Sequence, residues 1–324
     1  MNVVVTGGAG FLGQRLIDAL LKRSFLVDAN GARRSVEAIV AVDQAAAPAA
    51  PRVRSAVGDV SDPVFLRDVL HGADSVFHLA AVVSGAAEAD LDLGMRVNLD
   101  GTRALLDTLR VAGRAEGGAP KVVFASSVAV FGGALPAVVT DATAPMPQSS
   151  YGVQKLVGEL LVGDYARRGV IDGRSLRLPT IVVRPGKPNA AASSFASGII
   201  REPLAGVDAD CPVDGDTALW IASPRTAIDN LLHAHDLAAA AWTGSRALSL
   251  PGIAVTVDAM LSALEAIGGA AARARVKMRP DARIRAIVQT WPARFDTARA
   301  DAMGFVRDPD FESIVSAYVK EHLS

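Results

Sequence analysis

The hydrophobic positions of the chain follow two alternating patterns over its first half. Short runs of β-branched and other apolar residues predict strands, and apolar residues at spacings of three and four predict helices between them. Continuous apolar strands joined by helices are typical of a parallel sheet covered on both faces. The predicted strands are 2–7, 38–43, 53–59, 75–81, 121–127 and 175–183, and the predicted helices are 11–22, 63–70, 94–112 and 151–168.

The pattern changes after residue 183. The later sequence is rich in loops and mixes short helices with single strands. We therefore expect an α/β fold with a Rossmann-type, doubly wound parallel sheet over residues 1–183 and a smaller, mainly substrate-binding part over 184–324. A segment near 217–243 is expected to return to the main sheet.

Three glycines stand where the first strand passes into the first helix. Gly7, Gly10 and Gly13 follow the apolar run "NVVVT" directly. Glycine permits a tight turn and a close backbone approach to a pyrophosphate, which the N-terminus of the following helix attracts. The position predicts a dinucleotide-binding turn that includes Phe11 and Leu12, although a glycine turn without a ligand would have the same spacing.

The ends of the next strands carry further candidates for cofactor binding. Asp43 ends the second predicted strand, where a carboxylate accepts hydrogen bonds from the adenosine ribose and repels a 2′-phosphate. NAD is therefore favoured over NADP, although Arg33 and Arg34 in the preceding connection could reach a phosphate. Open α/β sheets bind ligands at the carboxyl ends of their strands. We accordingly expect contacts from the third and fourth strands, at Asp59, Val60, Leu79, Ala80 and Ala81.

A serine, a tyrosine and a lysine supply chemistry that suits such a cofactor. Tyr151 and Lys155 are four residues apart on one face of a predicted helix, and Ser127 ends the fifth strand. A nearby ammonium favours the phenolate, and lowering a tyrosine pKa from near 10 to about 7 needs roughly 4 kcal/mol. Tyr151 is then the base that removes a hydroxyl proton during hydride transfer to a nicotinamide, while Ser127 orients the substrate oxygen. Without this context, the pair would be a half-exposed tyrosine beside a solvated lysine.

Composition excludes several classes of partner. A formal net charge of −1 and a pI of about 6.5 give no basic surface for nucleic acid or anionic membrane. No apolar run approaches the ~20 residues of a membrane span, and the N-terminus lacks the cationic region of a signal peptide. The single cysteine, Cys211, fits a reducing compartment, so we expect a soluble, cytoplasmic protein. His233 and His235 point apart on a helix, and we expect no metal site.

The motifs taken together resemble one known family. "TGGAGFLG", "GDVSD", "HLAA", "NLDGT", "FASSVAVFG" and "YGVQK", with "DTARADAMGF" near the C-terminus, resemble the extended short-chain dehydrogenases/reductases, the NAD-dependent epimerases and dehydratases. The resemblance implies NAD as the cofactor and Ser127, Tyr151 and Lys155 as catalytic residues. It also implies a homodimer formed through helices 94–112 and 151–168. It implies further cofactor-site residues, namely Asn98 (in a mainly structural role), Ser126, Tyr151, Lys155, Pro179 and Thr180.

A narrower resemblance concerns the substrate. "RLPTIVVRPGKPNAAASSFASGIIREPLAG" and "SPRTAIDNLLHAHDL" are similar to family members that oxidise the C2 hydroxyl of a small sugar acid. An acid substrate needs cationic or amide groups around its carboxylate. Arg225 is the preferred anchor, and the other candidates for substrate binding are Ser84, Ser127, Tyr151, Arg184, Lys187 and Asn189.

Two other functions remain open at this point. One is a nucleotide-sugar epimerase or dehydratase that recycles tightly bound NAD. Against it, the segment "IASPRTAIDNLLHAHD" replaces the pattern usual in epimerases. The other is a non-catalytic dinucleotide-binding sensor, which would have no need of Ser127, Tyr151 and Lys155 together.

Overall fold

The centre of the molecule is a sheet of seven parallel strands. The computed structural model describes residues 1–112, 118–186 and 191–323, and the sheet has the order β12-β8-β7-β6-β1-β4-β5. This order, in which the chain runs outwards from β1 in both directions, confirms the predicted doubly wound α/β fold. The strands are β1 (Asn2–Thr6), β4 (Ala38–Asp43), β5 (Val53–Val57), β6 (Ser75–His78), β7 (Lys121–Ser127), β8 (Asp172–Leu178) and β12 (Ala247–Ser249).

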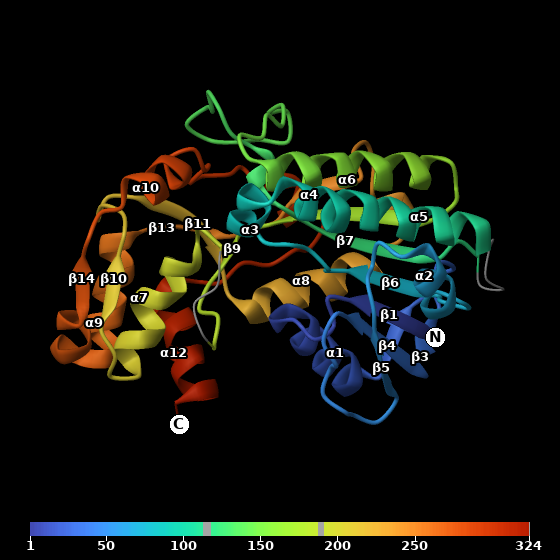
Figure 1. Cartoon of the computed structure of the whole chain (residues 1–324), viewed down its shortest axis with the longest axis horizontal. Coiled ribbons are helices and arrows are strands. Elements are labelled where there is room, and N and C mark those ends of the chain that lie inside the picture. The colour runs from blue at the N-terminus through green and yellow to red at the C-terminus, as the bar shows by residue number, and fades with distance from the viewer. Residues whose placement is uncertain (113–117, 187–190, 324) are drawn as a thin grey trace.

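Helices cover both faces of this sheet (Figure 1). One face buries apolar side chains of α1 (Phe11–Arg23) and α8 (Pro224–Asp236), among them Leu16 and Leu231. The other face packs against α2 (Pro63–Val69), α5 (Gly101–Ala112) and α6 (Ser150–Arg167), whose buried side chains include Leu66, Leu105 and Val162. Helix α8 lies within the segment that we expected to return to the main sheet.

The sixth predicted strand differs from the observed one. Residues 175–183 were expected to form one strand, but β8 ends at Leu178 and the short strand β9 (Thr180–Ile181) belongs to another sheet. Pro179 separates them because proline has no backbone N–H to donate to a sheet ladder. The interruption turns the chain out of the main sheet at the position where the cavity described below begins.

Two other connections are more elaborate than predicted. In place of the helix expected at 94–112, the structure has a π-helical segment (Met95–Asp100) followed by α5. Two short helices, α3 (Ser84–Ala89) and α4 (Leu91–Gly94), precede them. The connection between α1 and β4 contains an antiparallel hairpin of β2 (Phe25–Val27) and β3 (Arg33–Ser35). Neither feature has a simple apolar period, so the sequence pattern did not reveal them.

The C-terminal part has its own hydrophobic core beside the main sheet (Figure 1). A three-stranded sheet, in the order β13-β11-β9, and a two-stranded sheet of β10 and β14 lie there with α7, α9 and α12. The division at residue 183 stays a prediction, since both α8 and β12 come from the later half. The remaining elements are α7 (Ser194–Leu204), β10 (Ala209–Cys211), β11 (Ala218–Ala222), β13 (Ile253–Thr256), α9 (Val257–Ala274), β14 (Val276–Met278), α10 (Ala282–Val288), α11 (Ala298–Ala302) and α12 (Phe311–His322), with short 3-10 turns at Val128–Val130 and Ala239–Ala241.

Candidate active site

A cavity of about 800 Å³ opens at the carboxyl ends of the central strands. Its walls come from the turn after β1, the ends of β4, β6 and β7, the start of α6, and the segments after β8 and α10. Most of the residues predicted to bind cofactor or substrate line it. They are Gly7, Gly10, Phe11, Leu12, Gly13, Asp43, Val60, Leu79, Ala80, Ala81, Ser84, Ser126, Ser127, Tyr151, Lys155, Pro179, Thr180 and Arg184.

The glycine turn is built so that only glycine fits at its key positions. Gly7 has a φ of +72°, and the Gly10 amide donates to the Gly7 carbonyl oxygen at 3.0 Å. A Cβ on Gly13 would lie 2.0 Å from that same oxygen, so α1 packs directly onto the turn. The first turn of α1 has no side-chain cap and no acidic residue, which leaves its positive end open to the phosphates of a dinucleotide.

Asp43 lines the cavity beside the glycine turn. Its Oδ2 accepts a hydrogen bond from the Ala9 amide at 3.1 Å and its Oδ1 accepts one from the Gln44 amide at 2.7 Å, so the carboxylate is fixed beside the glycine turn. Arg33 and Arg34 do not line the cavity. The Arg33 guanidinium stacks on Phe25, and Arg34 lies 3.9 Å from a carboxylate oxygen of Asp74. The arrangement favours an unphosphorylated ribose.

Two predicted cofactor residues lie outside the cavity lining. The Asp59 carboxylate is turned back on its own loop, where Oδ1 accepts hydrogen bonds from the Ser61 amide and hydroxyl, each at 2.8 Å. Asn98 is buried and fastens the segment after β6, exchanging hydrogen bonds with the Val82 backbone and donating to Gln154 Oε1 at 2.8 Å. These hydrogen bonds support the cavity walls, which fits the mainly structural role expected for Asn98, and a direct cofactor contact of Asp59 stays a prediction.

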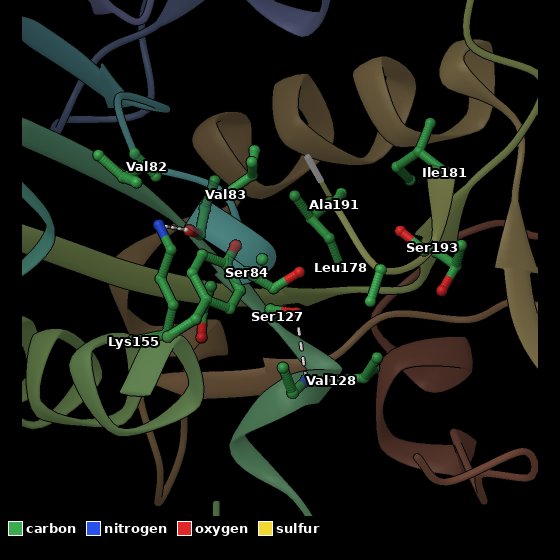
Figure 2. Close-up of a pocket in the computed structure, with 18 of the residues that line it drawn as sticks. Val82, Val83, Ser84, Ser127, Val128, Lys155, Leu178, Ile181, Ala191 and Ser193 are labelled. Atoms are coloured by element: carbon green, nitrogen blue, oxygen red, sulfur yellow. Dashed lines mark hydrogen bonds between the residues drawn. The ribbon is translucent and has the colours of Figure 1, made fainter. Parts of the chain in front are cut away.

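Ser127, Tyr151 and Lys155 meet at the junction of β7 and α6. Ser149 caps α6, its hydroxyl accepting from the Gly152 amide at 3.2 Å, and this start places Tyr151 in the first turn. Lys155 is 2% exposed, and its Nζ donates to the Ala125 carbonyl at 2.8 Å. Figure 2 shows Lys155 and Ser127 around the same space, with Ser84 beside them. The contact of strand β7 with helix α6 thus brings Ser127 to Tyr151 and Lys155, which come later in the sequence.

Burial dominates the protonation of this group. It raises the pKa of Tyr151 to about 12, against the opposing effects of a Ser127 hydrogen bond and the Arg184 charge. It also lowers the pKa of Lys155 to about 7, which the Glu159 carboxylate opposes. Burial is thus the largest effect on the phenol in this structure, and the expected contribution of the Lys155 ammonium to a lower Tyr151 pKa stays a prediction. An oxidised nicotinamide supplies both the hydride acceptor and a further positive charge when it is bound.

Of the two arginines expected at the substrate site, Arg184 faces the cavity and Arg225 does not. Arg184 donates to Ser193 Oγ at 3.3 Å and acts electrostatically on Tyr151. The Arg225 side chain is 81% exposed on α8, 3.9 Å from Asp229, and does not line the cavity. The preference for Arg225 as carboxylate anchor is therefore a wrong prediction, because the opposite face of α8 packs into the core. Lys187 and Asn189 lie outside the described residues.

Several residues of the cavity wall carried no sequence signal. They come from α3, the loop before α7 and the C-terminal region around α10, and none of them was singled out from the sequence; they include Glu88, Ser193, Ile287, Thr290 and Trp291. Ala191, Ile181 and Ser193 approach the cavity from the side opposite Lys155 (Figure 2). Only the folding of the C-terminal part against the sheet brings these segments to the site.

Other chemistry that the sequence raised is located elsewhere. His235 is buried and within 2.8 Å of Ser75 Oγ, while His233 lies 2.8 Å from the Met303 carbonyl oxygen. Among the described residues there is no cluster of three or more His, Cys, Asp or Glu side chains suited to a metal ion. Within the same part of the chain, no helix is both long enough and apolar enough to span a membrane.

A doubly wound sheet, a glycine turn at its first strand and a buried Ser–Tyr–Lys group define a dinucleotide-dependent enzyme of the short-chain dehydrogenase/reductase class. The sequence profile of the NAD dependent epimerase/dehydratase family matches residues 3–250. The chain belongs to this family, and its cofactor is NAD.

Relatives of known activity cover the whole chain. A D-erythronate dehydrogenase from Cupriavidus necator is 53% identical over 99% of this chain and 98% of its own length. A D-erythronate dehydrogenase from Haemophilus influenzae is 42% identical over 99% of each chain. The crystal structure of a nucleoside-diphosphate-sugar epimerase from Agrobacterium tumefaciens has 40% identity and a TM-score of 0.92, covering 100% of this chain and 94% of that one. These similarities and the family match identify an NAD-dependent dehydrogenase.

Proposed function

We propose that the protein oxidises the C2 hydroxyl of D-erythronate to 2-dehydro-D-erythronate, with NAD as hydride acceptor and Tyr151 as base. Two D-erythronate dehydrogenases share 53% and 42% of its residues over nearly the full chain. The observation that carries the proposal is Arg184, a half-buried cation in the cavity wall that acts electrostatically on Tyr151. A substrate that bears a carboxylate close to the reacting hydroxyl matches this arrangement.

The reaction follows from the positions of three side chains. Tyr151 would accept the proton of the C2 hydroxyl, and bound NAD would supply the acceptor for the C2 hydride, so that the alcohol would lose two electrons and become a ketone. Ser127 hydrogen-bonds the same oxygen and holds it towards Tyr151. Lys155, fixed by the Ala125 carbonyl at 2.8 Å, stabilises the phenolate through its positive charge. The buried site makes that charge more effective than it would be in water.

Arg184 is the proposed anchor for the substrate carboxylate. Among the described residues, no carboxylate lies within ion-pair distance of its guanidinium, which donates a hydrogen bond to the neutral Ser193 hydroxyl. Burial and the neighbouring Arg201 both lower the pKa of Arg184, so an anion placed there would relieve an unfavourable environment. Ser84, on the facing wall, is proposed to contact a substrate hydroxyl.

A nucleotide-sugar epimerase is the competing function. The similarity to a nucleoside-diphosphate-sugar epimerase at 40% identity favours this function, because the two proteins share the same fold. An epimerase returns its hydride to the substrate and releases no NADH, whereas the proposed dehydrogenase forms one NADH for each molecule oxidised. A panel of four-carbon sugar acids with NAD and with NADP, run beside nucleotide sugars, separates the two.

Substitution of the anchor tests the substrate class. Arg184→Gln should raise the KM for D-erythronate roughly 10- to 100-fold, because a charge-assisted hydrogen bond to carboxylate contributes about 1.5–3 kcal/mol. Arg225→Gln is the matched control and should leave KM unchanged, since that side chain is exposed outside the cavity. Equal effects of both substitutions, or none from Arg184→Gln, would remove Arg184 from the substrate site.

We also propose a homodimer formed through α5 and α6. These adjacent helices expose apolar side chains, with Val111 at 72% and Leu160 at 66%, and Val153 is exposed on the same helix as Leu160. Exposed apolar groups on neighbouring helices are typical of a protein–protein interface. Sedimentation equilibrium should show a dimer that Leu160→Glu converts to monomer.

A further inference from the structure

A buried ion pair lies directly behind the catalytic lysine. Glu159 follows Lys155 by one turn of α6 and is 5% exposed. Its Oε2 accepts a hydrogen bond from a terminal nitrogen of Arg177 at 2.7 Å. Arg177 Nε donates to both carboxylate oxygens, at 3.0 Å to Oε1 and 3.2 Å to Oε2. Ser126 donates a further hydrogen bond to Oε1 at 2.5 Å. The carboxylate is therefore held in one place from two strands, β7 and β8.

Two consecutive residues of β7 hold Lys155 and Glu159. Lys155 donates to the carbonyl of Ala125, and Glu159 accepts from the side chain of Ser126, the next residue of β7. Arg177 extends from this pair over the ring of Phe131, 4.8 Å from its centroid, and Phe131 lines the cavity. Any shift of the Glu159 carboxylate would thus disturb the strand that carries Lys155's hydrogen bond and Ser127.

A buried ion pair of this kind contributes little net stability. Removing two charges from water costs several kcal/mol per ion, and apolar residues of similar volume often stabilise a protein equally well. Its place one helical turn from a buried ammonium suggests a use in catalysis. We propose that Glu159 is a positioning residue for the reaction: held by Arg177 and Ser126, its carboxylate keeps the Lys155 ammonium charged beside Tyr151.

The charges around Lys155 support this assignment. Tyr151 lies on the same helix as Lys155, and His78 faces Lys155 from β6. Burial and the Lys155 charge lower the pKa of His78 to about 3, so this imidazole is neutral. Neither group offers a negative charge to the ammonium in the resting protein. Glu159 is the acid whose charge raises the Lys155 pKa, against the burial that lowers it to about 7. Arg177 is paired with the same carboxylate, and by Coulomb's law its positive charge opposes the effect of Glu159 on the ammonium.

The two partners of the pair should therefore act on Lys155 with opposite sign. Glu159→Gln removes the negative charge, leaves Arg177 in place, and should lower the Lys155 pKa by roughly 1 unit. Arg177→Gln frees the Glu159 charge to act on the ammonium and should raise the pKa by a similar amount. The double variant replaces the ion pair by two neutral amides, and its Lys155 pKa should lie between those of the two single variants. If the pair had only a structural role, the two single variants would not shift the Lys155 pKa in opposite directions.

The direct readout is the titration of Lys155 in protein labelled with ¹³C at lysine Cε, followed by NMR and assigned with Lys155→Met. Arg177→Lys, which keeps the charge, is the control and should titrate as the wild type does. Each single variant has its own signed prediction, so one that fails to fold leaves the other as the test. Shifts of the same sign in both, or an unchanged titration in Glu159→Gln, would overturn the assignment.

The kinetic readout rests on the proposed function. We expect kcat/KM for D-erythronate to fall at alkaline pH as Lys155 loses its proton. This alkaline limb of the pH profile should move to lower pH in Glu159→Gln and to higher pH in Arg177→Gln. A wild-type protein that oxidises no sugar acid would defeat the proposed substrate but leave the NMR titration intact. Normal oxidation with an unshifted lysine would defeat the role of Glu159 alone.

Discussion

At the scale of single residues, the site is governed by the competition between burial and charge. Burial alone would keep Tyr151 protonated and Lys155 neutral, which is the opposite of what a base and its ammonium need. The protein supplies Arg184 and Glu159 against this tendency, one acting on the tyrosine and the other on the lysine. Bound NAD adds its own charge, so proton transfer is coupled to cofactor binding.

Removal of the phenol tests the base. Tyr151→Phe keeps the ring and its packing but has no group to accept the substrate proton. We expect kcat to fall at least 100-fold, since a general base contributes about 10²–10⁴. NADH affinity, measured by fluorescence titration, should stay within about twofold. A variant that keeps full dehydrogenase activity would exclude Tyr151 as the base.

Residues on local motifs were predictable, and residues placed by distant packing were not. Gly7, Gly13 and Tyr151 were found because a turn or a helix spacing fixes their geometry within a few residues. The sequence led us to prefer Arg225 to Arg184 as the anchor, but both arginines follow a strand and precede or begin a helix-rich segment, so local sequence does not distinguish them. Which of them faces the cavity depends on which side of α8 is buried in the core, a property of the tertiary structure.

At the scale of elements, the contact of α6 with β7 sets the distance between lysine and strand. Gly158 lies on the buried side of α6, where an added Cβ would meet the Phe124 ring at 2.7 Å. Phe124 in turn lies under Lys155, whose Nζ is 4.8 Å from its ring centroid. The close approach that glycine permits is therefore part of the construction of the site.

A pair of glycine substitutions on this helix tests the contact. Gly158→Ala should destabilise the protein by about 1–3 kcal/mol through overpacking against Phe124, and should lower kcat by displacing Lys155. Gly163→Ala is the matched control, because nothing lies within 4 Å of its added Cβ. It should stabilise the protein by about 0.5–1 kcal/mol, the helix preference of alanine over glycine, and leave kcat unchanged. Urea unfolding and initial rates measure both, and equal behaviour of the two variants would contradict the contact.

The order of elements was also predictable, but their ends were less so. The apolar runs predicted the first five strands of the main sheet because parallel strands are buried on both faces. The end of β8 at Leu178 depends on Pro179, whose effect on the sheet a continuous apolar pattern hides. The π-helical segment before α5 has no period of its own in the sequence.

At the scale of the whole molecule, the two faces of the sheet are tied together by buried polar groups. His78 is enclosed between Thr6 and Thr102, at 2.7 and 3.0 Å, and His235 is within 2.8 Å of Ser75 Oγ. Burial lowers their pKa values to about 3 and about 4, so both imidazoles are neutral in the folded protein. In the unfolded chain they titrate near 6.5.

This difference predicts destabilisation in mild acid. Below a pH of about 6.5 the unfolded chain binds protons that the folded protein does not, so stability falls as the pH drops and stops falling only near the folded pKa values. Each histidine costs up to about 1.4 kcal/mol per pH unit, and together they should lower the free energy of unfolding by about 2.5 kcal/mol between pH 6 and pH 5. Urea unfolding at the two pH values measures this loss. His235→Asn should reduce it by about half, and no loss in the wild type would show that neither histidine is held neutral.

Isotope labelling is the most direct test of hydride transfer from C2 of a sugar acid to NAD. The protein is incubated with NAD and D-erythronate that carries deuterium at C2, and the NADH formed is examined by mass spectrometry. We predict one deuterium in each NADH and one 2-dehydro acid for each NADH. NADH without deuterium, or no NADH while a nucleotide sugar is converted, would contradict the account.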